Sequence, residues 1–207
     1  MHFVPGGYEQ AEQRAIEYAR QEGKTWVSPY NDPQVIAGQG TLGREIIADL
    51  APGRVLTIVV PVGGGGMLAG IGAALEKQMM RPRLVGVSAE ASAFMYSLYH
   101  RGTQQGVMDL PTLADGLSGA IEPNSLTISL VKKYADDFLT VSEDEIGRAI
   151  VFAWRTYGQI IEGSGAVGLA AFLAGKVAPP ALVVISGGNI QPEVHADLCR
   201  RYGEGQV

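Results

Sequence analysis

The pattern of hydrophobic and polar positions predicts alternating helices and strands along most of the chain. Over residues 8–23, apolar or aromatic side chains recur every three or four positions among charged ones, which is typical of a surface helix that ends at a glycine. Residues 25–30 (TWVSPY) favour a short strand, and the Asn-Asp-Pro that follows favours a turn. A second helix is predicted over 34–50, although its interior glycines weaken it.

Two continuous apolar runs indicate strands that are covered on both faces, as in a parallel sheet. They are residues 55–62 (VLTIVVPV) and 181–186 (ALVVIS). The first run is followed by glycines 63–66, a helix from Met67 to about Met79 and a strand over 83–90. Strand, helix and strand in this order predict a parallel pair joined by a right-handed crossover.

Four further helices are predicted, one of them with a strong start signal. In residues 142–158, Ser142 and Glu145 can each bond the backbone amide of the other, and Gly158 is suited to end the helix. The acidic residues of its first turn are therefore interpreted as helix-stabilising and not as catalytic. The other three helices are predicted over 92–101, from near Ser164, and over 192–202.

Composition and charge narrow the class of protein. The chain has 207 residues, of which 46% are hydrophobic, and a net charge of -5, which predict a globular protein without a surface for nucleic acid. The mostly apolar run between Arg54 and Glu76 has the length of a membrane span, but Pro61 and the glycines would break a spanning helix. A single cysteine and an N-terminus without signal-peptide features favour a cytoplasmic location. We therefore expect a small-molecule partner, and neither nucleic acid nor membrane.

The four glycines Gly63–Gly66 stand where the first buried strand meets a helix. The first amides of a helix lack backbone partners, and glycine lets them approach an anion closely, so this turn is a candidate phosphate site. It lacks the Gly-Lys-Ser/Thr ending of a P-loop. Besides a simple tight turn, two interpretations stay open here. One is a dinucleotide-binding fingerprint with Glu90 at the ribose; the other is a site for a single phosphate monoester, as in pyridoxal-phosphate proteins.

The second buried strand also ends in a glycine turn, with the sequence SGGN. In an open parallel sheet, ligands bind beyond the carboxyl ends of the strands, so Ser186 and Gly63–Gly66 can face one crevice although they are far apart in sequence. Ser186 can then hold the far end of a ligand whose phosphate lies on the glycines. Its alternative role is that of an ordinary turn or cap residue.

Several motifs occur together in an order that one enzyme family shares. They are DPQVIAGQGTLGREI, PVGGGGMLAGI, TLADGLSG, VSEDEI, EGSGAVGLAA and VISGGN. From Pro5 onward, the chain resembles the threonine/serine dehydratases and serine racemases, which are pyridoxal-phosphate enzymes of fold type II (tryptophan synthase β-like). The resemblance implies an α/β fold with an open, mostly parallel sheet and helices on both faces. It assigns 34–207 to the large cofactor-binding domain, without its N-terminal elements, and 1–33 to a remnant of the smaller α/β domain.

The resemblance also implies the cofactor, pyridoxal 5'-phosphate, and the residues that bind it. The phosphate is expected on Gly63, Gly64, Gly65, Gly66 and the amide of Met67, the pyridine nitrogen on Ser186, and the ring near Gly116 and Glu162. A serine hydroxyl is too weak an acid to protonate a pyridine, so the ring would be a modest electron sink. Dehydration of serine or threonine to a 2-oxo acid and ammonia is therefore favoured. The alternatives are a racemase, a nicotinamide-dinucleotide-binding half-domain and a non-catalytic fragment.

The family's catalytic lysine has no counterpart in this sequence. These enzymes bind the cofactor to a lysine, but none of the five lysines lies in the family's S-x-K-x-R-G context, and the loop for the substrate carboxylate is also absent. The chain therefore resembles an N-terminally truncated enzyme, and we expect it to be inactive alone. Metal-dependent relatives carry a carboxylate six positions after Glu90, where Tyr96 stands here, so no metal site is expected. The family predicts a homodimer for the full-length form.

Overall fold

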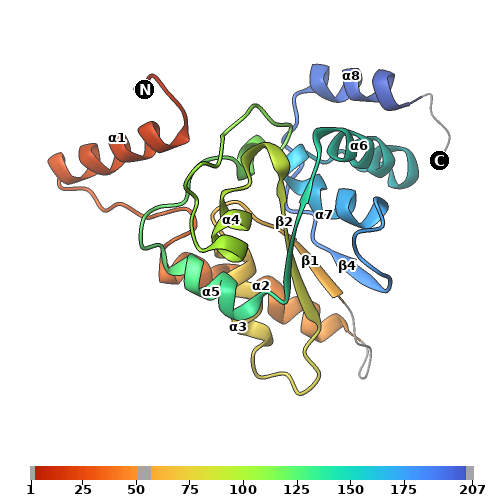
Figure 1. Cartoon of the computed structure of the whole chain (residues 1–207), viewed down its shortest axis with the longest axis horizontal. Coiled ribbons are helices and arrows are strands. Elements are labelled where there is room, and N and C mark those ends of the chain that lie inside the picture. The colour runs from red at the N-terminus through yellow and green to blue at the C-terminus, as the bar shows by residue number, and fades with distance from the viewer. Residues whose placement is uncertain (1–2, 51–56, 204–207) are drawn as a thin grey trace.

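The computed structural model describes residues 3–50 and 57–203. These residues form one four-stranded sheet flanked by helices (Figure 1). The strands are β1 (Thr57–Pro61), β2 (Arg83–Ala89), β3 (Asp137–Val141) and β4 (Ala181–Val183). Their order in the sheet is β3-β2-β1-β4, and each neighbouring pair is parallel. The predicted parallel α/β sheet is confirmed.

The helices lie on both faces of the sheet and beyond its left edge in Figure 1. They are α1 (Tyr8–Gln21), α2 (Pro33–Asp49), α3 (Gly66–Leu75), α4 (Phe94–Arg101), α5 (Leu126–Tyr134), α6 (Glu143–Tyr157), α7 (Gly163–Leu173) and α8 (Pro192–Tyr202). Two short 3-10 helices cover Glu90–Ser92 and Asp115–Leu117. Within the two described stretches, no helix is both long enough and apolar enough to cross a bilayer.

Each face of the sheet is buried by its own helical layer. On β1, Ile58 and Val60 belong to the core that α2, α3, α4 and α5 cover. Val59, which lies between them, belongs to the core formed with α6, α7 and α8. All three side chains have 0% exposure. Because successive strand residues point to opposite faces, a strand covered on both sides needs an apolar residue at every position, which explains the continuous run in the sequence.

The predicted helix boundaries that rest on capping chemistry are confirmed. At the start of α6, the Glu145 amide donates to Ser142 Oγ at 3.3 Å, and the Ser142 amide donates to Glu145 Oε2 at 2.8 Å. Gly158 ends this helix with a left-handed φ of 65°, which glycine adopts without strain. Helix α8 has the predicted bounds, and α2 begins and ends within one residue of them.

Two predictions in the first half of the chain are wrong. Residues 25–30 form no strand, because a strand needs a hydrogen-bonded neighbour and none of the described strands lies beside them. Helix α3 ends at Leu75, not near Met79, so the segment before β2 is a loop. Of the predicted strand 55–62, the first two residues lie outside the described part of the chain.

One helix and one strand were not predicted. Helix α5 and β3 follow each other over 126–141. β3 pairs only with β2 among the described strands, and only Phe138 and Val141 of its five residues are buried. An edge strand that is covered this incompletely does not need a continuous apolar run, so its sequence lacks the signal that β1 carries.

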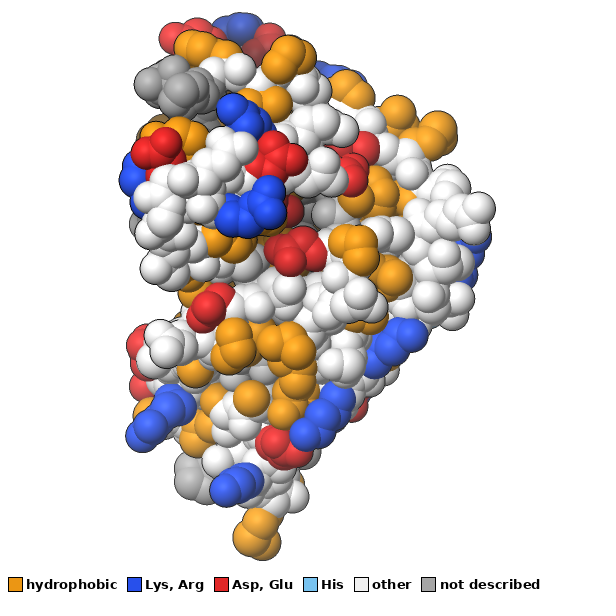
Figure 2. Space-filling model, turned by 90° about the vertical axis from the view of Figure 1, so that its left-hand side faces the viewer, with side chains coloured by type: hydrophobic (Ala, Val, Ile, Leu, Met, Phe, Trp, Pro, Cys, Tyr) orange, Lys and Arg blue, Asp and Glu red, His pale blue; other side chains and the backbone are white. Residues whose placement is uncertain are grey.

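Helix α1 extends away from the sheet (Figure 1). Figure 2 shows the molecule from that side, with charged side chains over both halves and a cluster of apolar side chains in the lower half. The connection between α1 and α2 passes close to the carboxyl edge of the sheet, where it contacts the loops described below. The division into domains at residue 33 stays a prediction.

Candidate functional site

The turn between β1 and α3 presents a row of backbone amides without partners. β1 ends at Pro61 and α3 begins at Gly66, and Gly65, the N-cap residue, has a φ of 88°. The amides of Gly63 to Met67 donate no hydrogen bond to any other described residue. Because the dipole of the helix adds positive potential at this end, the turn is suited to bind an anion.

The glycine loop fits closely between two other segments. A β-carbon on Gly64 would overlap the aromatic ring of Tyr30, and one on Gly63 would lie 2.9 Å from the Cα of Leu117. A β-carbon on Gly66 would lie 2.8 Å from the carbonyl oxygen of Tyr30. The loop therefore needs glycine at these positions because the surrounding chain leaves no room for side chains. The free amides in this narrow cradle fit a phosphate group.

A cavity of about 300 Å³ opens beside this loop. Its volume is at the lower end of the range of small-molecule sites, about 300 to 1,000 Å³. Three of the predicted site residues, Gly63, Gly64 and Gly116, line it together with Tyr8 and Tyr30. A larger groove of about 830 Å³ between α2 and α3 is lined mainly by small and apolar side chains and does not include the glycine loop.

Ser186 and Glu162 form a second group at the same edge of the sheet. Val183 of β4 lies opposite Val59 of β1, so the turns that follow both strands emerge at the same edge. Ser186 is exposed, whereas the carboxylate of Glu162 accepts a hydrogen bond from the Asn189 amide at 2.9 Å. The Glu162 amide donates to the Gly187 carbonyl oxygen at 3.2 Å. Glu162 therefore holds the SGGN turn in place against the start of α7.

Tyr30 and Glu122 connect the first 33 residues to the glycine loop, and the sequence analysis did not identify either of them as a site residue. The Glu122 amide donates to the Tyr30 hydroxyl oxygen at 3.0 Å. The Glu122 carboxylate accepts from Ser28 Oγ at 3.0 Å and from Asn31 Nδ2 at 3.0 Å. The Tyr30 and Glu122 positions are 92 residues apart, and no local pattern predicts their contact.

A second carboxylate adjoins this cluster. Glu12, on the buried side of α1, accepts a hydrogen bond from the Tyr8 hydroxyl at 2.9 Å. Burial raises the pKa of Glu12, and the nearby Glu122 carboxylate raises it further, although the Tyr8 hydroxyl bond opposes both. Burial and the two carboxylates also raise the pKa of Tyr8. Tyr8 therefore faces the cavity as a neutral phenol.

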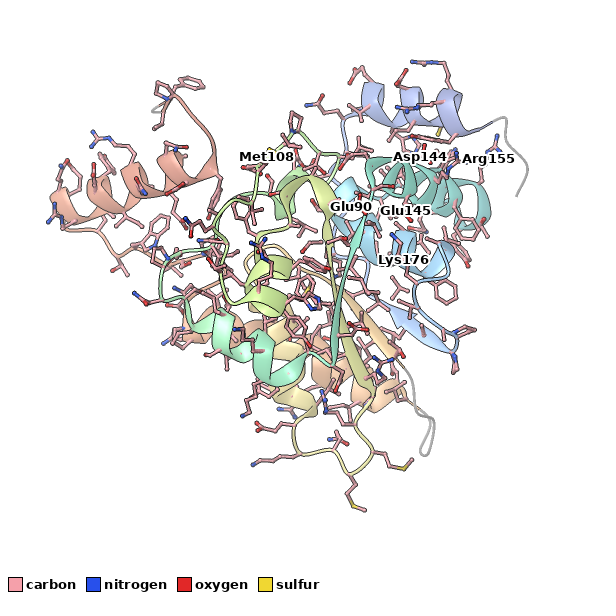
Figure 3. The ribbon with its side chains drawn as sticks, viewed as in Figure 1. Glu90, Met108, Asp144, Glu145, Arg155 and Lys176 are labelled. Atoms are coloured by element: carbon pink, nitrogen blue, oxygen red, sulfur yellow. The ribbon has the colours of Figure 1, made fainter. Side chains whose placement is uncertain are left out.

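No lysine lines the cavity beside the glycine loop, and all five lysines lie in the described residues. Lys176 donates to Glu145 at 2.8 Å and to the Thr140 carbonyl oxygen at 3.0 Å, and Figure 3 shows it pointing toward α6. Lys133 pairs with Glu76 at 2.6 Å. The remaining three are Lys24, above the ring of Tyr18, Lys77, in the groove between α2 and α3, and Lys132, near Gly102.

Among the described residues, no three His, Cys, Asp or Glu side chains are arranged to hold a metal ion. Glu90, at the end of β2, is exposed. Tyr96 packs on His100 with ring centroids 4.4 Å apart. Asp115 accepts a hydrogen bond from the Gly116 amide at 2.9 Å, as expected for a turn-stabilising carboxylate.

The fold and the glycine turn define an α/β protein with an anion site at the carboxyl edge of a parallel sheet. Residues 1–187 match the family described as "Pyridoxal-phosphate dependent enzyme". The match covers most of the chain, so the protein belongs to this family. This membership decides between the two ligand interpretations of the glycine loop in favour of pyridoxal phosphate over a dinucleotide.

The chain is similar to curated threonine dehydratases and to solved structures that include dehydratases and racemases. The chain is 42% identical over 189 residues to the L-threonine ammonia-lyase of Thermotoga maritima, with 88% of this chain and 45% of the relative covered. It is similar to the solved structure of the processed form of threonine deaminase isoform 2 from Solanum lycopersicum, with a TM-score of 0.83, 26% identity, and 99% of this chain and 57% of that chain covered. It also resembles a serine racemase from Dictyostelium discoideum, with a TM-score of 0.74, 30% identity, and 88% and 59% covered. The chain spans about half the length of the curated relatives it matches.

Proposed function

We propose that this chain is the cofactor-binding part of a pyridoxal-phosphate-dependent ammonia-lyase that converts serine or threonine to a 2-oxo acid and ammonia. The observation that carries the proposal is the row of free amides from Gly63 to Met67 beside a cavity of about 300 Å³. Family membership supplies the cofactor, and the 42% identity to an enzyme named L-threonine ammonia-lyase supports the reaction.

In this proposal, each part of the site has a separate task. The amides of Gly63–Met67 hold the phosphate, and Tyr30 and Leu117 keep the loop in position. Gly116 lines the cavity in which the ring would lie. When bound, pyridoxal phosphate withdraws electrons from an attached amino acid and makes its α-proton acidic.

The hydroxyl of Ser186 restricts how much negative charge the cofactor ring can store. This hydroxyl can donate one hydrogen bond to the ring nitrogen but is too weak an acid to transfer the proton. A ring that stays neutral stores little negative charge, which suits loss of a β-hydroxyl group together with the α-proton. Glu162 contributes by holding the SGGN turn through Asn189. We therefore favour dehydration over racemisation.

The positions of the lysines lead us to propose that the chain alone binds the cofactor without a covalent bond. Treatment of the protein–cofactor mixture with borohydride, followed by denaturation and intact-mass analysis, tests this. Borohydride fixes any cofactor that is bound to a lysine. An adduct formed at the phosphate site would be suppressed by competing inorganic phosphate. We expect to find no adduct of this kind. A phosphate-sensitive adduct on any lysine would contradict the proposal.

The reaction is tested by product analysis. We expect the chain with cofactor to release no 2-oxo acid from L-serine or L-threonine. The matched experiment adds the region of the Thermotoga maritima relative that this chain does not cover, as a second polypeptide. Release of 2-oxo acid by the mixture only supports both the lyase and the inactivity of the isolated chain. Release by the chain alone would contradict its inactivity, and inversion of the amino acid without release would argue against the lyase.

Further expectations from the sequence remain proposals. From the family resemblance, we propose that the full-length protein is a homodimer that binds a small amino acid. From composition and charge, we propose that it resides in the cytoplasm and has no nucleic-acid or membrane partner. Light scattering during size-exclusion chromatography measures the oligomeric state directly, and a monomer at all concentrations would contradict the proposed homodimer.

A further inference from the structure

The hydroxyl of Ser164 is buried without a hydrogen-bond partner. Ser164 is the second residue of α7 and is 4% exposed. Among the described side chains, its Oγ is the buried polar atom that lacks a partner. The other fully buried serines do have partners; Ser97 Oγ, for example, donates to the Thr103 carbonyl oxygen at 2.6 Å. A buried hydroxyl without a partner costs folding free energy, so its presence requires an explanation.

The first backbone amides of the same helix also lack hydrogen-bond partners among the described residues. α7 begins at Gly163, and the amides of Gly163, Ser164 and Gly165 donate no hydrogen bond to another described residue. All three residues are buried. Unpaired amides at a helix start normally reach solvent or a capping side chain. The N-cap residue, Glu162, provides no side-chain cap, because its carboxylate binds the SGGN turn.

Ser164 lies between the two groups of predicted site residues. Its Oγ is 2.9 Å from the position that a β-carbon on Gly116 would take, and Gly116 lines the cavity. On the other side, a β-carbon on Gly165 would lie 3.4 Å from the Ser186 amide nitrogen and closer still to Gly187. The start of α7 therefore contacts both the wall of the cavity and the turn that carries Ser186.

We propose that Ser164 is a further cofactor-binding residue, whose hydroxyl forms a hydrogen bond with a polar atom of the cofactor ring. This inference rests on the proposed function, because it requires the phosphate to be held at Gly63–Gly66. A pyridoxal ring carries a nitrogen, a hydroxyl and an aldehyde oxygen, and a serine hydroxyl can donate to or accept from these groups. The ligand thus supplies the partner that the protein itself does not.

The test compares Ser164→Ala with Ser97→Ala in the whole chain. Binding of pyridoxal phosphate and of inorganic phosphate is measured for each variant by calorimetry, and thermal unfolding is measured without ligand. For Ser164→Ala we expect pyridoxal phosphate to bind about fivefold to tenfold more weakly, as for loss of one hydrogen bond. Inorganic phosphate, which has no ring, should bind as it does to the wild type.

The unfolding data separate a binding role from a structural one. Ser164→Ala should unfold at the same temperature as the wild type or higher, because it removes an unpaired buried hydroxyl. Ser97→Ala should unfold at a lower temperature and keep the wild-type affinity for pyridoxal phosphate. Equal affinity of Ser164→Ala and wild type for pyridoxal phosphate would overturn the inference, and so would an equal loss for both ligands. If the wild type binds neither ligand, the proposed function itself fails.

Discussion

The aromatic ring of Tyr30 occupies the space that any side chain on Gly64 would need. Tyr30 belongs to the connection between α1 and α2, and its hydroxyl oxygen accepts a bond from the Glu122 amide at 3.0 Å. The ring therefore supports the glycine loop and lines the cavity as well. The position of the proposed phosphate site thus depends on three segments that are distant in sequence.

Substitution of Gly64 should remove phosphate binding. In Gly64→Ala, the new methyl group overlaps Tyr30, so either the ring or the loop must move. Displacement of two or more of the amides should weaken binding of pyridoxal phosphate by a factor of ten or more, since about 1.4 kcal/mol corresponds to tenfold. Calorimetry or fluorescence titration measures this change.

Two further variants serve as controls for Gly64→Ala. Gly38 lies in α2 with nothing within 4 Å of a potential β-carbon, so Gly38→Ala should leave binding unchanged and stabilise the helix by about 0.5 to 1 kcal/mol. The double variant with Tyr30→Ala should recover part of the lost affinity, because the ring no longer collides with the methyl group. Full affinity in Gly64→Ala alone would refute the proposed role of the loop.

Removal of the Glu122 carboxylate should loosen the first 33 residues. Glu122→Ala loses the bonds from Ser28 and Asn31, each 3.0 Å long, and bonds to a charged group contribute about 1 to 3 kcal/mol each. We expect faster tryptic cleavage after Lys24 than in wild type. Glu17→Ala, which removes an exposed pair with Arg14, should leave the cleavage rate unchanged. Equal rates in both variants would show that Glu122 does not hold this segment.

Glu12 should make the fold less stable as the pH rises. Its pKa is raised in the folded state by burial and by the nearby Glu122 carboxylate, so the folded state favours the protonated form. Stability is then greatest below the ordinary glutamate pKa, about 4.3, and falls as the pH rises through the higher folded value. Glu12→Gln should therefore melt above wild type at pH 7, with a difference that vanishes near pH 4. A difference between Glu12→Gln and wild type that stays constant with pH would contradict this assignment.

The pair of Glu145 and Lys176 should stabilise the fold at neutral pH and lose this effect in acid, which is the opposite of the pH dependence expected for Glu12. Partial burial opposes ionisation of Glu145, but the Lys176 ammonium at 2.8 Å and the Ser142 amide lower its pKa overall. The stabilisation is therefore present above the ordinary glutamate pKa and is lost as the pH falls through the folded value. Lys176→Met should cost about 1 kcal/mol or less at pH 7 and progressively less in acid. Arg148→Met, which breaks an exposed pair with Asp144, serves as the control and should cost almost nothing.

Local sequence patterns were sufficient for the parts of the fold that have local causes. The glycine loop, the α6 capping box and the buried strand β1 each follow from the chemistry of a few consecutive residues. Residues 25–30 have the composition of a strand but no neighbouring strand to pair with, and β3 lies at an edge where apolar residues are fewer. Strand formation depends on partners, so composition alone could not decide either case.

The candidate site was predictable only in part, because some of its contacts join positions that are distant in sequence. Gly63, Gly64 and Gly116 were expected from family motifs, and the structure brings them around one cavity. Tyr30 and Glu122 belong to no motif, and only the folded chain brings these distant positions into contact. The unpaired hydroxyl of Ser164 could not be predicted either, because only the folded structure shows which buried groups lack hydrogen-bond partners.

The most direct test of this account is calorimetric titration of the whole chain with pyridoxal phosphate, in the presence and absence of inorganic phosphate. We predict saturable binding that inorganic phosphate weakens by competition and that Gly64→Ala abolishes or strongly reduces. Absence of binding, or binding that neither phosphate nor Gly64→Ala affects, would contradict the claim that the glycine loop is the phosphate site of this protein.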